Sequence, residues 1–408
     1  MPNSINKKLN ICFILFFIFL FISIITKAQV YNGLVKDECK DSINCRIQFS
    51  ISDKSFSNIR NSRGSKLSFS DIQMNYNGLD IPIKSLNIRG KTTLFYPKKS
   101  FNVKLKKKLG IQCSHDTAVV KDFYLLGLSM DRNYINNYTS YSLLKALNIF
   151  NLKFSYCEVL INNVTQGIYL FIERPDDYAL KTLKSPVLIR RGFNMEIDKI
   201  ELNKENQAES YRYFRKKFTH MYSLCNKFSG SELYDSLNSY IDLSQYMKWL
   251  GFNYIIRNGD YTDELYLYFN THENRFGIIP WDYDDLFAVH PHEGRDARNA
   301  VNGGQFIFSS EDRLDRAIIT DEYLYKMYLK ELLVVGDLLN ENVLTEIFQK
   351  TYCSVYPYYL DNNIMETTRL DKYGLTNKDD LFNNLQEKLR SFLTIRLLIK
   401  QQVNTNFR

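Results

Sequence analysis

The hydrophobic periodicity of the chain changes near residue 205, and this change constrains the fold more than any other feature of the sequence. Before that point, Phe101, Val103 and Leu105 alternate with polar residues, which is the period-two pattern of a half-buried strand. After it, apolar residues recur at the spacing of an amphipathic helix, as in Tyr211, Phe214, Phe218, Met221 and Cys225. The order predicts an α+β fold of two lobes, a β-rich N-terminal lobe and a mostly helical C-terminal lobe.

Local signals predict several elements on either side of this boundary. We expect a helix over residues 131–147, capped by Asp131. A hairpin of strands at 156–161 and 167–172 is expected to turn at Asn162-Asn163. Short strands are also predicted at 265–269 and 276–279.

A capping box opens one further helix. Asp242 and Gln245 stand three residues apart before an apolar stripe, which is the pattern of a helix start. We expect this helix to end near Asn258-Gly259, with the glycine as the left-handed residue after the helix. Asp260 would then leave the helix end in a loop.

The first 28 residues have the pattern of a signal peptide. Lys7 and Lys8 precede an apolar run at 11–25, and Ala28 offers a small residue at a cleavage point. The alternative is a membrane anchor, but the run is shorter than the ~20 residues that span a bilayer. We therefore expect export to a secreted, periplasmic or cell-surface location, and no integral membrane protein after cleavage.

Cysteine usage fits an oxidising compartment. Seven cysteines occur, and Cys39 and Cys45 are close enough in sequence to close a small loop by a disulfide. The cysteines that lie inside apolar segments are expected to be buried small hydrophobes: Cys113, Cys157, Cys225 and Cys353. No spacing of Cys and His indicates a zinc site.

The sequence divides into four segments. After the signal peptide at 1–28, residues 29–75 are expected to form short strands and loops. The main domain is predicted over 76–345, with its N-lobe at 76–195 and its C-lobe at 196–345. Residues 346–408 are expected to form a helical extension packed on the C-lobe.

The charge balance is mildly basic. The formal net charge is +8 with three lysines in the leader, which leaves about +5 for the mature chain. This excess suits a phosphate-rich ligand or an acidic partner. No long basic block or nucleic-acid motif occurs, so we expect no nucleic-acid partner.

Acidic residues stand at two loop ends joined by the hairpin of 265–279. Asp260 follows a helix, whereas Asp282, Asp284 and Asp285 follow a strand. The hairpin should bring both ends to one edge of the fold, where the carboxylates repel one another unless a cation joins them. Mg²⁺ prefers carboxylate and phosphate oxygens, so a magnesium site is predicted. The alternatives are surface acids beside a helix end, or a metal-dependent hydrolase; with only five His, the hydrolase has least support.

The same order of helix, loop, hairpin and acid occurs in protein kinases, where one Asp accepts the substrate proton and a second holds magnesium. The chain has no His-Arg-Asp, Asp-Phe-Gly, Gly-rich phosphate loop or Walker sequence, so an orthodox kinase is excluded. Arg89, Lys98 and Lys104 lie on or beside predicted strands and suit phosphate oxygens, and Glu173 is a candidate to orient one of the lysines. A solvated basic face and an ordinary surface glutamate are the alternatives.

Four segments together resemble the CotH kinase family, over roughly residues 80–345. The segments follow the family's order: Leu86-Asn-Ile-Arg-Gly90 with Tyr96-Pro-Lys-Lys-Ser-Phe-Asn-Val-Lys-Leu105; Asp122-Phe-Tyr-Leu-Leu126 with Asp131-Arg-Asn-Tyr-Ile-Asn136; Glu158-Val-Leu-Ile-Asn-Asn163 with Gly167-Ile-Tyr-Leu-Phe-Ile-Glu173; and Asn258-Gly-Asp260 with Tyr266-Leu-Tyr268 and Pro280-Trp-Asp-Tyr-Asp284. The Pro-Trp-Asp-x-Asp motif is the most specific of them.

The resemblance implies an atypical protein-kinase-like fold that binds ATP and Mg²⁺ and phosphorylates proteins on Ser or Thr. The protein itself is one candidate substrate. Asp260 matches the catalytic-loop Asp, the expected base. Asp282 matches the first Asp of the tryptophan motif, the expected magnesium ligand, and Asp284 is expected to assist it. Lys98 and Lys104 match basic positions of the first segment, where phosphate contact is expected.

One stretch departs from the family pattern. Members usually carry an Asn between the loop Asp and the Tyr-Leu-Tyr strand, whereas this chain has Asp263 and Glu264 there. A carboxylate at Glu264 is still a metal ligand, but its added negative charge opposes ATP. A catalytically weak or inactive surface or coat-type binding protein is therefore the alternative function.

Overall fold

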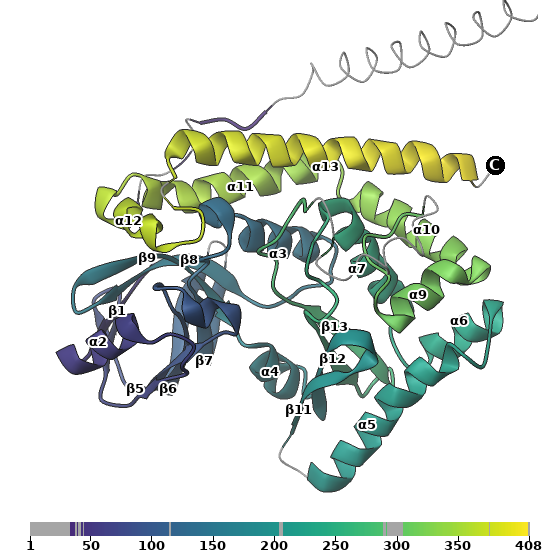
Figure 1. Ribbon diagram of the computed structural model, residues 1–408, viewed down its shortest axis with the longest axis horizontal. Helices are drawn as coiled ribbons and strands as arrows, with labels where there is room; N and C mark the ends of the chain where they lie inside the picture. The colour runs from purple at the N-terminus through teal and green to yellow at the C-terminus, as the bar shows by residue number, and fades with distance from the viewer. Residues whose placement is uncertain are drawn as a thin grey trace, which may run out of the picture. The chain divides into compact units, whose positions relative to one another are not determined.

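The computed structural model describes residues 33–36, 39, 42–43, 45–113, 116–203, 207–288, 291, 305–374 and 376–406 (Figure 1). The predicted signal peptide and its cleavage point lie outside the described residues. The chain divides into two compact units after Val35, and the description below concerns the second unit, Lys36–Arg408. In the part of the chain that the structure describes, no helix has both the length and the apolar character needed to cross a membrane.

The N-terminal lobe is built on a nine-stranded sheet with the strand order β2-β5-β6-β7-β9-β8-β1-β3-β4. Its strands are β1 Arg46–Ser50, β2 Ser68–Phe69, β3 Gln73–Tyr76, β4 Leu79–Ile81, β5 Ile83–Arg89, β6 Ser100–Cys113, β7 Asp116–Leu126, β8 Phe154–Ile161 and β9 Val164–Glu173. The helical elements beside them are α2 Asp53–Asn61, η1 Thr92–Phe95, η2 Arg132–Tyr134 and α3 Asn136–Ala146. The predicted alternation in β6 is confirmed, because Phe101, Val103 and Leu105 are buried at 0–1% exposure.

The C-terminal lobe combines a four-stranded sheet, in the order β11-β10-β12-β13, with most of the helices. Its strands are β10 Val187–Arg191, β11 Ile197–Leu202, β12 Leu265–Asn270 and β13 Arg275–Pro280. Its helical elements are α4 Pro175–Asp177, η3 Tyr178–Thr182, η4 Phe193–Met195, α5 Gln207–Leu224, α6 Gly230–Asn238, α7 Leu243–Ile256, α9 Arg313–Thr320, α10 Glu322–Leu338, α11 Glu341–Tyr359, α12 Asn362–Glu366, η5 Thr367–Leu370 and α13 Lys378–Asn406. The predicted α+β fold class, with its β-rich and helical parts in this order, is confirmed.

The start of α7 was predicted correctly and its end was not. The carboxylate of Asp242 caps the helix by accepting the Gln245 N–H at 3.0 Å. The left-handed residue after the helix is Arg257, with φ 46°, and not Gly259. Gly259 instead permits a close approach: a Cβ there would overlap a carboxylate oxygen of Asp285 and crowd the Cβ of Ala288.

The helix predicted from residue 131 begins later, at Asn136. Asn133 and Tyr134 have positive φ values of 59° and 62°, which interrupt the helical path. Asp131 still caps α3 from five residues away, because its carboxylate accepts the N–H groups of Asn136 and Asn137 at 2.8 and 2.9 Å. The predicted turn at Asn162-Asn163 is confirmed; both residues have positive φ, as a tight two-residue hairpin turn requires.

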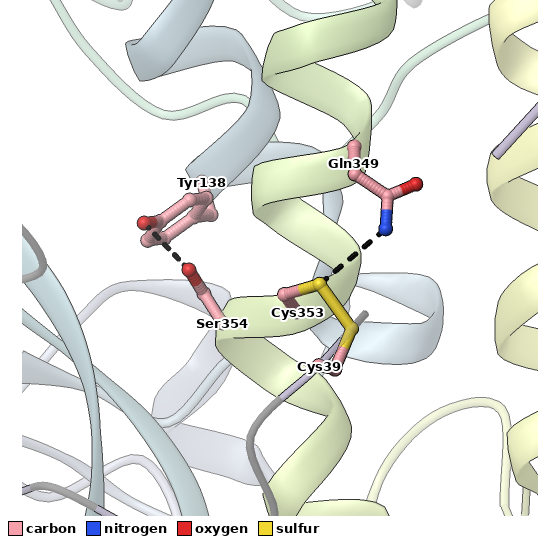
Figure 2. Close-up of a disulfide and its surroundings, with 5 residues drawn as sticks. All are labelled: Cys39, Tyr138, Gln349, Cys353 and Ser354. Carbon is pink, nitrogen blue, oxygen red and sulfur yellow. Dashed lines mark hydrogen bonds between the residues drawn. A yellow bond between two sulfur atoms is a disulfide. The ribbon is translucent and has the colours of Figure 1, made fainter. Parts of the chain in front are cut away.

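The expected disulfide is wrong in its partner. Cys39 is bonded to Cys353 of α11, across 314 residues, whereas Cys45 is free and buried (Figure 2). Cys353 is therefore not a buried small hydrophobe, whereas Cys157 is fully buried, as expected. The Cys353 Sγ accepts a hydrogen bond from Gln349, and the neighbouring Ser354 hydroxyl lies 3.0 Å from that of Tyr138 in α3 (Figure 2).

The C-terminal helices join both lobes. In Figure 1, α13 runs beside α11, and the two helices are in contact. α13 also contacts α7 and α10, while α11 and α12 contact β8 and β9 of the nine-stranded sheet. The extension was expected to pack on the C-lobe; the structure adds the N-terminal sheet to its neighbours.

Candidate active site

Two loops that carry the predicted acids run side by side. The first follows α7 and contains Asp260, and the second follows β13 and contains Asp282 and Asp284. The Gly259 N–H donates to the Asp285 carbonyl at 3.0 Å, and the Trp281 N–H donates to the Glu264 carbonyl at 3.0 Å. The β12–β13 hairpin thus brings the two loop ends to one edge of the four-stranded sheet.

The carboxylates of these loops act on one another electrostatically. Burial raises the pKa of Glu264 well above its usual range, and the charges of Asp282 and Asp260 raise it further. Burial does the same to the pKa of Asp284, again with contributions from Asp282 and Asp260. Glu264 and Asp284 therefore share the same two acidic neighbours, Asp282 and Asp260, which are the residues predicted as metal ligand and base.

Asp282 has an unusual backbone. Its φ is 50°, in the left-handed region that is uncommon for residues other than glycine. Burial raises the pKa of its carboxyl, whereas the charges of Arg89 and Arg190 lower it. Such a conformation costs on the order of 1–3 kcal/mol and is found most often at functional sites.

The donor set suits magnesium in its chemistry. Among the described residues, no three acidic, His or Cys side chains already form a metal-binding group. Mg²⁺ commonly takes only one or two carboxylates from a protein and completes its shell with water and phosphate oxygens. Asp282 and Asp284 fit that requirement, because they supply two carboxylates from one loop, and burial raises the pKa of both.

Arg89 is the predicted cation that the structure brings to the acids. It ends β5, and its guanidinium lies 3.9 Å from the ring centroid of Tyr124 and 6.0 Å from that of Trp281. Its charge lowers the pKa of Asp282, so it faces the acidic loops. The sheet of the N-terminal lobe thus presents at least one cation to the acids of the C-terminal lobe.

Lys91 is a second cation at this place, and sequence reasoning missed it. Its Nζ lies 3.6 Å from Asp198 and 4.0 Å from Asp263, and its side chain is 64% exposed. The signal was its place two residues after Arg89, just past a strand end, where a side chain leaves the sheet toward the other lobe.

Lys98 is not brought to the acids. It is buried at 2% exposure, and its Nζ lies 3.5 Å from Asp371 and 4.6 Å from the ring of Tyr134. Burial lowers its pKa, and the charge of Asp371 opposes that shift. The geometry assigns Lys98 to a buried ion pair between the N-terminal sheet and the segment before α13, which does not support the predicted phosphate contact.

Lys104 and Glu173 have neighbours other than the acids of the two loops. Lys104 stands in register with Asp122 of β7, on the half-exposed face of the sheet. Glu173 pairs in register with the buried Phe123, and its carboxylate accepts the Lys153 N–H at 2.6 Å. Glu173 orients a backbone loop instead of a lysine.

Glu264 has a partner that the sequence did not reveal. The Nη2 of Arg190, in β10, donates to both carboxylate oxygens of Glu264, at 2.6 and 2.7 Å. The same guanidinium lies 3.4 Å from Asp198. The added charge of Glu264 is thus offset by a half-buried guanidinium and is not left unpaired.

The loop after β13 is fixed by the amides that begin α3. Asn136 donates from Nδ2 to the Asp284 carbonyl at 2.8 Å, and Asn137 Oδ1 accepts the Tyr283 N–H at 2.9 Å. The Asp131 carboxylate in turn accepts a hydrogen bond from the Asn137 side chain. Burial raises the pKa of Asp131 to about 7. Two sequence motifs, 131–136 and 280–284, are therefore in direct contact.

Comparison with known proteins gives one match that covers most of the chain. The family described as CotH kinase protein matches residues 86–398, which includes parts of both lobes and most of α13. No curated protein matches the chain. One similar solved structure is the Shewanella oneidensis MR-1 toxin–antitoxin complex of HipA, HipB and operator DNA. It is 12% identical, covers 88% of this chain and 73% of that chain, and has a TM-score of 0.26. A likeness this distant says nothing about function.

Proposed function

This chain belongs to the CotH kinase family, and from that premise we propose that it transfers the γ-phosphoryl group of Mg²⁺-bound ATP to Ser or Thr residues of a protein. The observation that carries the proposal is the acidic cluster of the two hydrogen-bonded loops, in which the charges of Asp282 and Asp260 both act on Glu264 and on Asp284. Arg89 and Lys91 face it from the other lobe. A kinase needs both halves of this arrangement, acids for the metal and cations for phosphate.

Each residue has a role in the proposal. Asp282 and Asp284 would hold the metal, which would supply positive charge against the negative charge of the phosphate groups. Arg89 and Lys91 would contact phosphate oxygens from the sheet. Asp260 would orient the acceptor hydroxyl in line with the γ-phosphorus and accept its proton. Most of the rate would come from positioning and electrostatic stabilisation.

The proposal includes export. Its support is the signal-peptide pattern of residues 1–28 and the Cys39–Cys353 disulfide, since disulfides persist in oxidising compartments. Because ATP is scarce outside cells, the acceptor would be modified during or soon after export. The protein itself and a surface or coat protein are the acceptors to test.

A non-catalytic binding protein is the second candidate, and one observation favours it. Asp263 or Glu264 stands where the family usually has an amide, and Arg190 already occupies the carboxylate of Glu264. A pair this well formed would have to be compatible with a bound metal and nucleotide for transfer to occur.

The direct test is incubation of the mature protein with labelled ATP and Mg²⁺. Asp260→Asn and Asp282→Asn are compared with wild type and with Asp235→Asn, a change at an exposed acid of α6. We expect label on protein in wild type and Asp235→Asn, and a loss of at least 100-fold in the other two. Nucleotide binding without any transfer would instead support the binding protein.

A further inference from the structure

Two consecutive arginines end β10 and serve opposite sides of the sheet. Arg190 lies toward the acids, whereas the side chain of Arg191 is buried at 1% exposure. A guanidinium buried this deeply is unfavourable unless its charge and hydrogen-bonding groups have partners. The partners of Arg191 therefore indicate what the residue does.

Arg191 holds the loop that carries Asp260. Its Nε donates to the Thr262 carbonyl at 2.7 Å, and Thr262 is fully buried midway between Asp260 and Glu264. From the other side, Arg190 holds Glu264 by its carboxylate and lies 3.4 Å from the Asp263 carbonyl. The two arginines thus bind three successive residues of the 260–264 loop, Thr262, Asp263 and Glu264.

The buried guanidinium is itself fixed by several elements. Its Nη1 donates to the Tyr246 hydroxyl of α7 at 2.5 Å, and lies 3.6 Å from Asp312 and 3.9 Å from Asp315 of the α9 region. Asp312 also caps α9 by accepting the Leu314 N–H, at 2.8 Å.

The network extends further through two tyrosines. The Tyr222 hydroxyl of α5 donates to Asp312 at 3.1 Å, and the Tyr246 hydroxyl donates to Asp315. The anchor of the loop is therefore tied to α5, α7 and α9 at once. A planar guanidinium with several donors in fixed directions can serve a carbonyl, a hydroxyl and two carboxylates together, which an ammonium group cannot do in the same geometry.

We propose that Arg191 is the positioning residue of the 260–264 loop: it sets the backbone from the buried side so that Asp260 is held against the acids of the second loop. The expected effect of Arg191 on kcat rests on the proposed function. The structural part, an ordered loop held through the Thr262 carbonyl, stands apart from any activity.

The test compares Arg191→Lys with a matched change, Arg275→Lys. Arg275 lies at the opposite end of the same sheet and pairs with Asp242 and Glu273. We expect Arg191→Lys to lower kcat by 10- to 100-fold while the KM for ATP stays within threefold of wild type. In Arg275→Lys both constants should stay within threefold.

A second readout does not depend on activity. In hydrogen exchange, the amides of residues 259–265 should exchange at least tenfold faster in Arg191→Lys than in wild type, with β6 and β7 unchanged. Tyr246→Phe removes one partner of the guanidinium without removing charge. It should speed the exchange of the same amides by a smaller factor. It is the deciding variant if Arg191→Lys fails to fold.

The outcomes separate the two proposals. A wild-type protein without transfer, in which Arg191→Lys still loosens residues 259–265, contradicts the kinase and leaves the loop anchor supported. An active wild type in which neither variant changes kcat or loop exchange overturns the role of Arg191. Faster exchange in every element of Arg191→Lys would also overturn the role of Arg191, because it would show that the residue stabilises the whole fold and not this loop.

Discussion

Arg190 and Glu264 form a two-pronged ion pair, with one guanidinium nitrogen 2.6 and 2.7 Å from the two carboxylate oxygens. Asp263 or Glu264 stands where the family usually has an amide, and the pair shows how the chain accommodates the charge of Glu264. The charge of Arg190 also lowers the pKa of Asp282. This one guanidinium therefore acts on both loops of the candidate site.

We predict that the two residues are strongly coupled. Arg190→Gln should leave the Glu264 carboxylate without its cation, and lower the free energy of unfolding by about 3 kcal/mol, as for other interrupted buried pairs. Adding Glu264→Gln should recover at least 1 kcal/mol of that loss. The measurement is a double-mutant cycle by denaturant unfolding. Additive effects of the two changes would contradict the coupling.

Lys98 should matter for stability and not for ATP. Lys98→Met leaves Asp371, whose side chain is 5% exposed, without its cation and should cost about 3–5 kcal/mol of unfolding free energy. Combining it with Asp371→Asn should recover part of the loss. In the protein that remains folded, ATP affinity measured by calorimetry should stay within threefold of wild type. A tenfold loss of ATP affinity at unchanged stability would restore the phosphate contact that the sequence predicted.

Asp131 should give the protein a distinctive pH dependence. Burial raises its pKa from 3.8 to about 7, so the folded protein binds this proton more tightly than the unfolded chain does. Its contribution is fully present below pH 3.8 and is lost as the pH rises through about 7, a change of about 4 kcal/mol at 1.36 kcal/mol per pKa unit. Denaturant unfolding measured from pH 4 to pH 7 should therefore show the free energy of unfolding of Asp131→Asn rising relative to that of wild type.

The titration of Lys388 falls outside the pH window of the Asp131 prediction. Burial lowers the pKa of Lys388 to about 8, so its own contribution changes above that pH and not between 4 and 7. Asp235→Asn, at an exposed position, is the control and should run parallel to wild type. Parallel profiles for wild type and Asp131→Asn would mean that the Asp131 carboxyl titrates normally.

The disulfide should stabilise the fold through its long span. Chain-entropy arguments give on the order of 5 kcal/mol for a loop this long, and 2–5 kcal/mol is usual for loss of a native disulfide. Cys353→Ser should lower the unfolding free energy by about that amount, whereas Cys225→Ser, at a free thiol, should have less effect. Peptide mapping without reductant should find Cys39 joined to Cys353. A Cys39–Cys45 peptide would contradict the structure.

Sequence reasoning succeeded where the deciding interactions are local. The alternation in β6, the Asp242 cap of α7 and the Asn162-Asn163 turn each depend on residues within a few positions of one another. The two acidic loops were also found, because a single hairpin separates them. These patterns are fixed by short-range geometry that the order of residues expresses directly.

Sequence reasoning failed where a residue's partner comes from a distant segment of the chain. Lys98 pairs with Asp371 across 273 residues, and Cys39 bonds to Cys353 across 314. Both Arg190 and Arg191 meet the 260–264 loop because β10 pairs with β12, a contact without a local signature. A lysine beside a strand looks the same in sequence whether its side chain is exposed, as in Lys91, or buried against a carboxylate, as in Lys98.

The measurement closest to the central claim is nucleotide binding by calorimetry, with a non-hydrolysable ATP analogue. It compares wild type with Asp282→Asn, each with Mg²⁺ and with a chelator. We predict that wild type binds the analogue with Mg²⁺, and that removing either the metal or the Asp282 carboxylate weakens binding at least 30-fold. If Asp282→Asn binds the Mg²⁺ complex as tightly as wild type, the two acidic loops are not the nucleotide site.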